Sequence, residues 1–142
     1  MAKKPKASRG RLASMRVSAG FRDFALDQLS DVPGLRPRAM FGGVGLYADE
    51  VFFGILAADV LYFKVDDSTR NEYEAAGSSP FKPYPDRAMT MPYYSVPIQI
   101  LEDAVMARQW AARAVAAAIA AKEAKASAVR KKPPATKKKA SA

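Results

Sequence analysis

The sequence predicts an α+β fold, in which an antiparallel sheet of about four strands packs against an N-terminal helix and a long C-terminal helix. Three runs rich in Phe, Tyr, Val, Ile and Leu follow one another at 38–47, 51–57 and 60–65. Only the short polar segments "ADE" and "AD" separate them, which favours antiparallel hairpins. Helical patterns stand before and after these runs. Together these observations predict one sheet with helices against it.

The first and last helices have recognisable ends. The first begins near Ser18, whose hydroxyl is a favourable N-cap, and the segment "DVPGLRP" ends it. The last begins near Asp103, where the carboxylates of "ED" suit the positive end of the helix dipole, and it continues to about Ala126. One of its faces is mostly small, which would let it approach the sheet closely; that face contains Met106, Trp110, Ala114, Ala117 and Ala121.

A short helix and a fourth strand are predicted between these two helices. The segment "DDSTRNEYEAAG" predicts the helix, because residues 66–69 offer several N-caps, Thr69 and Glu72 have capping-box spacing, and Gly77 suits its C-terminal end. The segment "SSPFKPYPDR" predicts a loop, and "AMTMPYYSV" predicts the strand. Pro92 within that strand favours an edge position, because proline has no amide hydrogen to donate to a neighbouring strand.

The composition excludes several classes of function. The 142 residues are enough for one domain and too few for two ordinary ones. The chain contains no Cys and no His, which removes disulfides, Cys–His and Ser–His–Asp catalysis, and zinc sites built on these residues. No acidic motif indicates a calcium site. We therefore expect no catalytic residue, no metal ligand and no cofactor.

The sequence also bears on location. No uncharged apolar run approaches the roughly 20 residues that a membrane-spanning helix needs. The basic N-terminal segment is not followed by the apolar region of a secretory signal. We therefore expect a cytoplasmic protein without membrane contact. An organelle transit peptide is the alternative, because Arg and Ser occur near the start and no acidic residue precedes Asp23.

The net charge of +9 lies in the two ends of the chain. Residues 1–11 carry +5 and residues 122–142 carry +7, whereas residues 12–121 carry −3. A nucleic-acid-binding domain ordinarily carries its positive charge on the fold itself. By this criterion, only the ends of this chain can contact nucleic acid.

The same composition predicts the domain boundaries. We expect a disordered basic arm at 1–14, a folded domain at 15–122 and a disordered Lys/Ala/Pro-rich tail at 123–142. Lysines without aromatic neighbours bind polyanions through counterion release and recognise no base sequence. Solubilising ends with no partner are the alternative. The candidate nucleic-acid contacts are Lys3, Lys4, Lys6, Arg130, Lys131, Lys132, Lys137, Lys138 and Lys139.

The segment "GVGLYA" matches the loose form of a dinucleotide-binding fingerprint. That fingerprint requires a helix after the glycines, but the sequence "DEVFFGIL" that follows is typical of a strand. No Lys-Ser/Thr pair follows either, which excludes a P-loop. We therefore expect the glycines to lie within the sheet.

Alternation along that strand predicts a hollow in the sheet. Phe41, Gly43, Gly45 and Tyr47 would share one face, so the glycines form a floor between aromatic walls. The expected occupant is the last helix, through Trp110 or Met106. A small ligand or a side chain of a partner protein is the alternative.

Four further residues are candidates for contact with a partner. Tyr93 and Tyr94 point to opposite faces of a strand, and we expect one in the core and the other exposed. Arg36 and Arg38 flank the glycine strand and could bind an acidic partner, although solvated charges are the simpler interpretation.

Lys64 ends the third strand and leaves two interpretations open. A buried lysine has a shifted pKa and can act as a base. More often such a side chain extends to the rim of the sheet and pairs with a carboxylate, and Asp66 is the nearest in sequence.

Three stretches are similar, in this order, to the N-terminal domain of the TfoX/Sxy competence-regulator family. They are "MFGGVGLYADEVFFGILAADVLYFKVDD", "EYEAAGSSPFKPYP", and "MPYYSVPIQILED" with a following Trp. The resemblance covers residues 15–122. It implies a compact α+β domain without known catalytic activity. In the better-known members of the family, this domain is tied to the transcriptional activation of DNA-uptake genes, alongside a cyclic-AMP-responsive activator.

The chain departs from the family pattern in two places. The full-length regulators have a C-terminal helical module, where this chain has a Lys-rich tail. The turn at 48–50 lacks the Asp-Gly pair common in the family, which changes the turn type.

The resemblance and the composition together imply a non-enzymatic regulatory or adaptor protein. The folded domain would bind another protein, such as part of the transcription machinery, while the basic ends contact nucleic acid. A nucleoid-type DNA-associated protein whose ends dominate is one alternative. A small-ligand-binding domain that uses the glycine hollow is the other.

Overall fold

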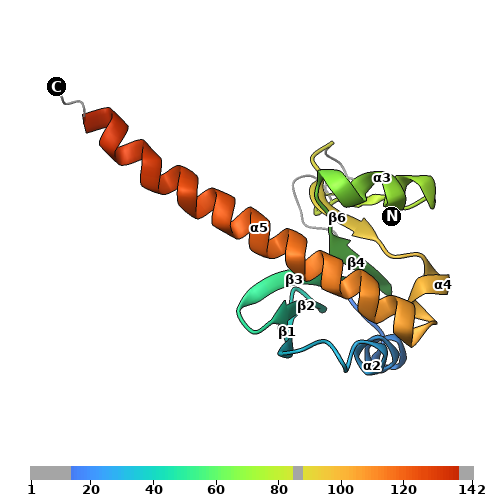
Figure 1. The fold of residues 1–142 in the computed structure, drawn as a ribbon. Helices are drawn as coiled ribbons and strands as arrows, with labels where there is room; N and C mark the ends of the chain where they lie inside the picture. Colours follow the sequence, from blue (N-terminus) through green and yellow to red (C-terminus); the bar gives the residue numbers. More distant parts are fainter. Residues whose placement is uncertain (1–13, 85–87, 138–142) are drawn as a thin grey trace, which may run out of the picture.

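The computed structural model describes residues 14–84 and 88–137, with side chains as far as Ala128. Its α+β fold confirms the predicted class (Figure 1). The sheet is antiparallel throughout, with the strand order β1-β2-β3-β4-β6-β5. The elements are α2 (Ala19–Gln28), β1 (Leu35–Met40), β2 (Gly43–Ala48), β3 (Val51–Ala57), β4 (Val60–Lys64), α3 (Asp67–Ala75), β5 (Pro80–Phe81), β6 (Met91–Ser95), α4 (Ile98–Leu101) and α5 (Ala104–Lys137).

The sheet has six strands, so the prediction of about four was wrong. The run at 38–47 is two strands, β1 and β2, because the chain turns at Phe41 and Gly42. Both residues have positive φ, 51° and 87°, as a two-residue hairpin turn requires. The remaining additional strand is β5, which lies in the segment predicted as a loop and pairs with β6.

The prediction that Pro92 marks an edge strand was also wrong. β6 lies between β4 and β5. The register shifts beside β5, so that Pro80 lies opposite Tyr94 while Phe81 lies opposite Met91. Pro92 falls within this irregularity, where an amide hydrogen is not needed. Its carbonyl still accepts a hydrogen bond of 3.0 Å from the Val65 amide.

The predicted starts of the two large helices are confirmed. The Ser18 hydroxyl accepts a 3.3 Å hydrogen bond from the Phe21 amide at the start of α2. The Asp103 carboxylate accepts from the amides of Val105 and Met106 at the start of α5, both at 3.1 Å. α5 runs to Lys137, past the end expected near Ala126.

The short helix α3 begins after Asp66, one of the N-cap candidates in 66–69, and its capping box is not the predicted pair Thr69 and Glu72. Its N-cap is Asp66, which accepts from the amides of Ser68 and Thr69 at 2.9 and 3.0 Å. Thr69 completes the capping box by accepting from the Asp66 amide at 3.1 Å, so it is not the N-cap. Gly77 lies just beyond the helix with φ of 84°, as expected for a C-terminal glycine.

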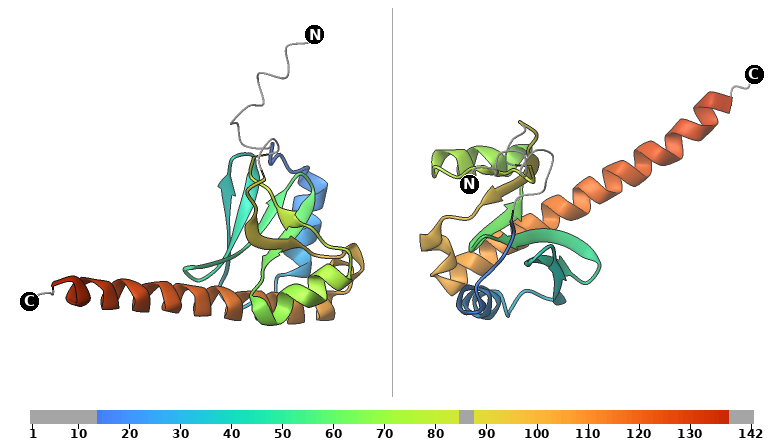
Figure 2. Two further views of the ribbon diagram at one scale, coloured as in Figure 1. Left: turned by 90° about the horizontal axis from the view of Figure 1, so that it is seen from above. Right: turned by 180° about the vertical axis from the view of Figure 1, so that it is seen from behind.

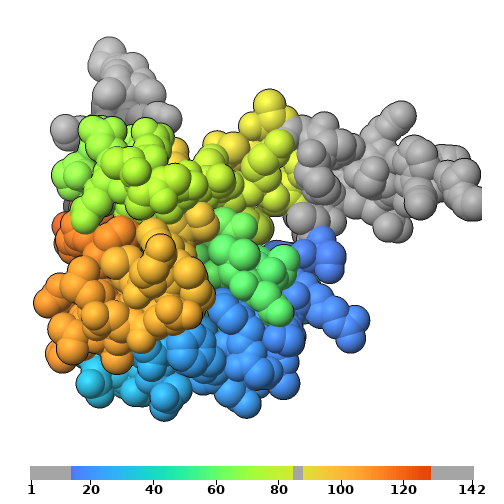
Figure 3. Space-filling view, turned by 90° about the vertical axis from the view of Figure 1, so that its right-hand side faces the viewer, coloured from blue at the N-terminus to red at the C-terminus, as the bar shows by residue number. Residues whose placement is uncertain are grey.

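One face of the sheet forms the main core against the helices. Its largest fully buried side chains are Leu46, Phe53, Leu56, Leu61 and Phe63. α5 contributes small residues and Trp110, so it lies close to the strands and then continues past the sheet (Figure 2). On this side, α3 and α2 lie on opposite sides of the segment that contains α4 and the beginning of α5 (Figure 3). The buried residues of α5 are Ala107, Trp110, Ala111, Ala114, Ala117 and Ala118.

The opposite face of the sheet has a smaller cluster, in which no buried residue of a described helix takes part. The segment before α2 covers part of it. Met15 is buried there, and its carbonyl accepts from the Ala58 amide at 3.3 Å. The Val17 amide donates to the Gly42 carbonyl at 3.2 Å. These bonds connect two hairpin turns at one end of the sheet and leave much of this face without a helix.

Candidate functional site

The glycine hollow is closed by the sheet itself. Gly43 and Gly45 lie on the face opposite the helices, as the alternation in β2 predicts. A Cβ atom at Gly45 would lie 2.8 Å from the Met40 Sδ and 3.2 Å from the Phe52 Cε1. At Gly43 it would lie 2.8 Å from the Met15 carbonyl oxygen. Side chains and backbone of neighbouring segments therefore fill the space.

Two expectations about this hollow were wrong: its occupant and one of its walls. Trp110 lies on the other face, with its ring centroid 4.8 Å from that of Tyr73, and Met106 also packs against the helix-side core. Phe41 is not a wall of the hollow, because it is in the turn and its side chain is 68% exposed. That turn folds β1 back along β2 and brings Met40 opposite Gly43, so no helix is needed to fill the space.

Tyr93 and Tyr94 point to opposite faces as predicted, but both are buried, so the expected exposed contact is absent. Tyr94 lies on the helix side, where its hydroxyl donates a 2.9 Å hydrogen bond to Glu74. Tyr93 lies on the other face and is 6% exposed. Burial raises the pKa of Tyr93 to about 12. Phe52 and Lys64 lie over its ring, which explains the burial.

Three rings form a row across the face that the helices leave uncovered. We call Tyr47, Phe52 and Tyr93 the aromatic row. The ring centroids of Tyr47 and Phe52 are 5.1 Å apart, and those of Phe52 and Tyr93 are 5.4 Å apart. A cation lies over each end: the Arg38 guanidinium 5.5 Å from the Tyr47 centroid, and the Lys64 ammonium 5.4 Å from that of Tyr93.

A register shift between β2 and β3 places Phe52 in this row. Tyr47 pairs with Phe52 but Leu46 pairs with Gly54, so Phe53 is an extra residue on β3. Phe53 consequently turns into the helix-side core and is fully buried, while Phe52 stays half-buried on the opposite face. Sequence reasoning missed Phe52 because strict alternation does not reveal a bulge.

A pocket of about 520 Å³ adjoins the Tyr93 end of the row. Its walls come from the sheet, through Phe52, Lys64 and Tyr93, and from α5, through Lys122 and Lys125. Burial lowers the pKa of Lys64, and the positive charges of Lys125 and Arg70 lower it further. The expected pairing of Lys64 with Asp66 is absent, because the Asp66 carboxylate caps α3.

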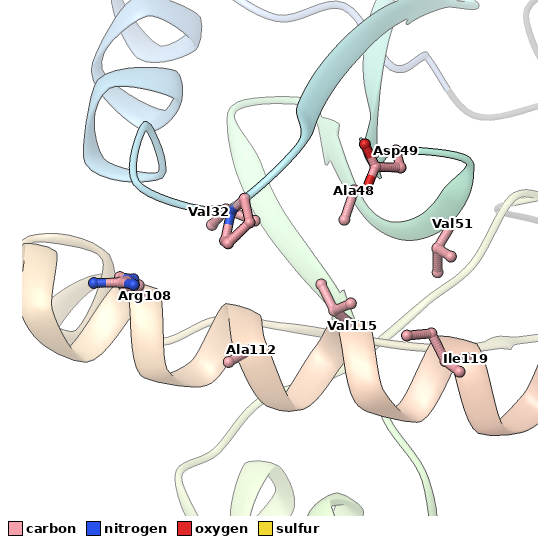
Figure 4. A pocket seen from close by; sticks show the side chains of 9 residues that line it. Val32, Ala48, Asp49, Val51, Arg108, Ala112, Val115 and Ile119 are labelled. Atoms are coloured by element: carbon pink, nitrogen blue, oxygen red, sulfur yellow. The ribbon is translucent and has the colours of Figure 1, made fainter.

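A second hollow, which we call the apolar groove, lies between α5 and the turn joining β2 to β3 (Figure 4). Its volume is about 460 Å³. Ile119 faces it and is 39% exposed, while Val115 is partly buried against the core. The α5 residues that line the groove follow one another at intervals of three or four, so the sequence alone places them on one face of a helix; they are Arg108, Ala112, Val115 and Ile119. The lining residues are Val32, Pro33, Ala48, Asp49, Val51, Arg108, Ala112, Val115 and Ile119.

The other predicted site residues have different outcomes. Arg36 and Arg38 are exposed and line a pocket with Tyr47, next to the aromatic row. Lys3, Lys4, Lys6, Lys138 and Lys139 lie outside the described residues. Arg130, Lys131, Lys132 and Lys137 belong to the part of α5 whose side chains are not described.

Two searches of the described residues concern metals and membranes. Within 14–84 and 88–137, no group of three or more His, Cys, Asp or Glu is placed to hold a metal ion. None of the helices in this part of the chain combines the length and apolar character needed to cross a membrane.

The model of the TfoX N-terminal domain matches residues 27–118. The chain belongs to the TfoX N-terminal domain family. No curated protein matches the chain. The matched region of this TfoX-family protein contains the aromatic row and all of the apolar groove except Ile119. Lys122 and Lys125, at the pocket beside Tyr93, lie beyond it.

Proposed function

We propose that this TfoX-family protein is a non-enzymatic regulatory adaptor, which acts in transcription regulation by binding another protein in the apolar groove. The observation that carries the proposal is the exposure of Ile119 beside Val115 in a hollow of about 460 Å³. Apolar side chains in a concave surface are typical of sites that receive an apolar anchor from a partner. The partner expected from the family is a component of the transcription machinery.

The charges beside the groove give the docking an orientation. Arg108 lies toward one end of the groove, and Asp49 lies at the turn between β2 and β3 (Figure 4). A partner segment with an apolar anchor between an acidic and a basic residue would match both. The lack of His and Cys in the chain supports a binding role rather than catalysis.

The basic ends have a separate role in this proposal. They would contact nucleic acid non-specifically and hold the adaptor near DNA, in the cytoplasm. The positive charges of residues 1–11 and 122–142 support this role. The regulated genes would then be selected by the partner protein and not by the ends of this chain.

Transcript profiling in the source organism tests the adaptor role. A strain lacking the protein is complemented with the wild type, with Ile119→Glu or with Ile98→Glu. Ile98 is the matched control, because it is an exposed isoleucine on α4 outside the groove. We expect the wild type and Ile98→Glu to restore the altered transcripts and Ile119→Glu to fail. Full restoration by Ile119→Glu, at equal protein level, would contradict the proposal.

A second variant separates the adaptor from a nucleoid-type protein. It replaces Lys131, Lys132, Lys137, Lys138 and Lys139 by Gln in the full chain. We expect its non-specific duplex affinity to fall and its affinity for the identified partner, measured with purified components, to stay unchanged. Loss of transcript control together with unchanged partner binding would favour the nucleoid-type protein.

A further inference from the structure

We propose that the aromatic row and the adjoining lysines bind single-stranded nucleic acid. Bases would stack on the rings of Tyr47 and Phe52, and backbone phosphates would meet Lys64, Lys122 and Lys125. The rings and Lys64 belong to the sheet and Lys122 and Lys125 to the described part of α5, whereas the nucleic-acid contacts expected from the sequence are Lys3, Lys4, Lys6 and residues 130–139. It goes beyond the adaptor role and does not depend on the apolar groove.

The rings form a prearranged platform for stacking. Tyr47 and Phe52 are half-buried, so each ring is held in place while part of it stays accessible. Tyr93 supports Phe52 from below, with its centroid 5.4 Å away. Rings fixed by their neighbours lose little freedom when a base stacks on them. Proteins that bind single strands use such aromatic platforms, because every base has a flat face.

The lysines provide positive charge beside the platform: Lys64 lies within residues 12–121, which carry −3 overall, whereas Lys122 and Lys125 lie at the start of the basic segment 122–142. They come from β4 and from α5, which are distant in sequence. None of the three forms a salt bridge with a carboxylate in the described side chains. Lys64 and Lys125 line the same pocket; burial is the main cause of the lowered pKa of Lys64, and the positive charge of Lys125 lowers it further, so the two ammonium groups repel each other. A phosphate between them would relieve this repulsion and release counterions.

The far end of the row repeats the combination of ring and cation. The Arg38 guanidinium lies 5.5 Å from the Tyr47 ring centroid, and Arg36 lines the same pocket. Cations at both ends and rings between them match the alternation of phosphate and base along a strand. The platform therefore has room for more than one nucleotide.

Two features favour a single strand over other polyanions. Stacking on these rings requires unpaired bases, which a duplex keeps inside its helix. Glu50 lines both pockets that flank the row. Its carboxylate repels phosphates and carboxylates alike, but unpaired bases offer it amino groups as hydrogen-bond donors, which the side chains of an acidic protein segment lack.

Fluorescence anisotropy with a short labelled oligothymidine tests the stacking surface. The full-length wild type is compared with Phe52→Leu, which keeps an apolar side chain and removes the ring. Phe24→Leu is the control, because Phe24 is an exposed phenylalanine on α2 outside the surface. At about 0.2 M salt, where contacts of the basic ends are weakened, we expect Phe52→Leu to bind about tenfold more weakly. Equal affinities of both variants, with unchanged circular dichroism, would overturn the proposal.

Salt titration tests the lysines. The double variant Lys122→Glu/Lys125→Glu is compared with Arg22→Glu/Arg108→Glu, which changes the net charge equally on other surfaces. Each phosphate contact adds about 0.7 to the slope of log K against log salt for a single strand, so losing two lowers it by about 1.4. We expect that loss only in the lysine variant. Equal slopes in the two variants would overturn the proposal.

Competitors distinguish the kinds of ligand. Unlabelled oligothymidine should displace the probe at lower phosphate concentration than thymidine monophosphate, a DNA duplex or polyglutamate. A monophosphate that competes equally would indicate a mononucleotide pocket, an equally effective duplex would indicate non-specific charge binding, and equally effective polyglutamate would indicate an acidic protein partner. Each of these three results overturns the proposal.

Photocross-linking locates the bound strand. An oligonucleotide containing 5-bromouracil is irradiated in complex with the full chain, and the labelled peptides are identified by mass spectrometry. We expect labels on peptides that contain Tyr47, Phe52 or Tyr93. Labels confined to residues 1–13 and 129–142 would show that only segments outside this surface hold the strand, and would overturn the proposal.

Discussion

The two faces of the sheet differ in how their aromatic side chains are covered. On the helix side, Phe53 and Phe63 are fully buried beneath α5 and take part in the main core. On the opposite face, Phe52 and Tyr47 stay half-buried in a row that cations flank at both ends. The same strands thus supply stability on one side and an accessible surface on the other, and the bulge in β3 decides which of the two adjacent phenylalanines faces the helices.

The adjacent pair Phe52 and Phe53 gives the largest expected difference. Phe53→Ala removes a fully buried ring and should lower the free energy of unfolding by about 3–5 kcal/mol. Phe52→Ala should lower it by less than half as much, because that ring is only half-buried. Urea unfolding followed by circular dichroism measures both. Equal losses would contradict the division of the two faces.

Replacing the glycines of β2, on the face that the helices leave uncovered, should lower the free energy of unfolding by less than Phe53→Ala does. A Cβ at Gly43 would collide with the carbonyl oxygens of Leu56 and Met15, so Gly43→Ala should cost about 1–3 kcal/mol. Gly45→Ala should cost less, because its nearest neighbour is the flexible side chain of Met40. Thermal unfolding of both variants measures the order. If Gly45→Ala is the more damaging, the packing at this hollow differs from that described.

The raised pKa values of two buried tyrosines predict that the free energy of unfolding decreases at alkaline pH. Burial raises the pKa of Tyr73 on the helix side, and that of Tyr93 on the other face to about 12. An unfolded tyrosine ionises near pH 10, so the folded state keeps protons that the unfolded state loses. The free energy of unfolding should therefore fall between pH 10 and 12, by about 1.4 kcal/mol per pH unit for each such phenol. Below pH 10 these phenols should cause no change.

Replacement by phenylalanine assigns this alkaline loss to the two faces. Tyr73→Phe and Tyr93→Phe should each reduce the slope of stability against pH above pH 10, which urea unfolding at several pH values measures. An unchanged slope in Tyr93→Phe would show that its hydroxyl reaches water and that the less covered face is looser than its burial indicates.

An ion pair on the helix side should have the smallest effect. Arg113 donates a short hydrogen bond to Glu72, which lowers the pKa of that carboxyl. Both side chains are more than 40% exposed, so Arg113→Ala should cost less than about 1 kcal/mol. Because the pKa of Glu72 is lower in the folded state than in the unfolded state, the ion pair stabilises the fold above the pH range where a free glutamate titrates. This stabilisation is lost as the pH falls through the pKa of the folded state. The difference between wild type and variant should accordingly vanish in acid and shrink in high salt.

The parts of the fold that depend on neighbouring residues could be predicted from the sequence. Ser18 and Asp103 cap their helices through amides within three residues, and such contacts follow from local spacing. The motifs around the glycine strand placed the chain in its family, which the matched residues 27–118 confirm. The domain boundaries and the role of the basic ends remain predictions.

Other features escaped the sequence for identifiable reasons. A positive φ at Phe41 is unusual for a bulky residue, so the hairpin between β1 and β2 had no recognisable turn signal. β5 contains two residues, too few to show a period. Lys64 and Lys125 share one pocket through the packing of α5 beside β4, and their spacing in the chain gives no sign of it.

The sequence by itself determined the chemical inventory of this protein: no His, no Cys, an alanine face on the last helix, and aromatic strands interrupted by glycine. Only the tertiary structure decided where those side chains lie. The bulge at Phe53 and the turn at Phe41 set which strand residues face the helices and which face away. Strand register depends on hydrogen bonds between distant segments, and a shift of one residue exchanges the two faces of a strand.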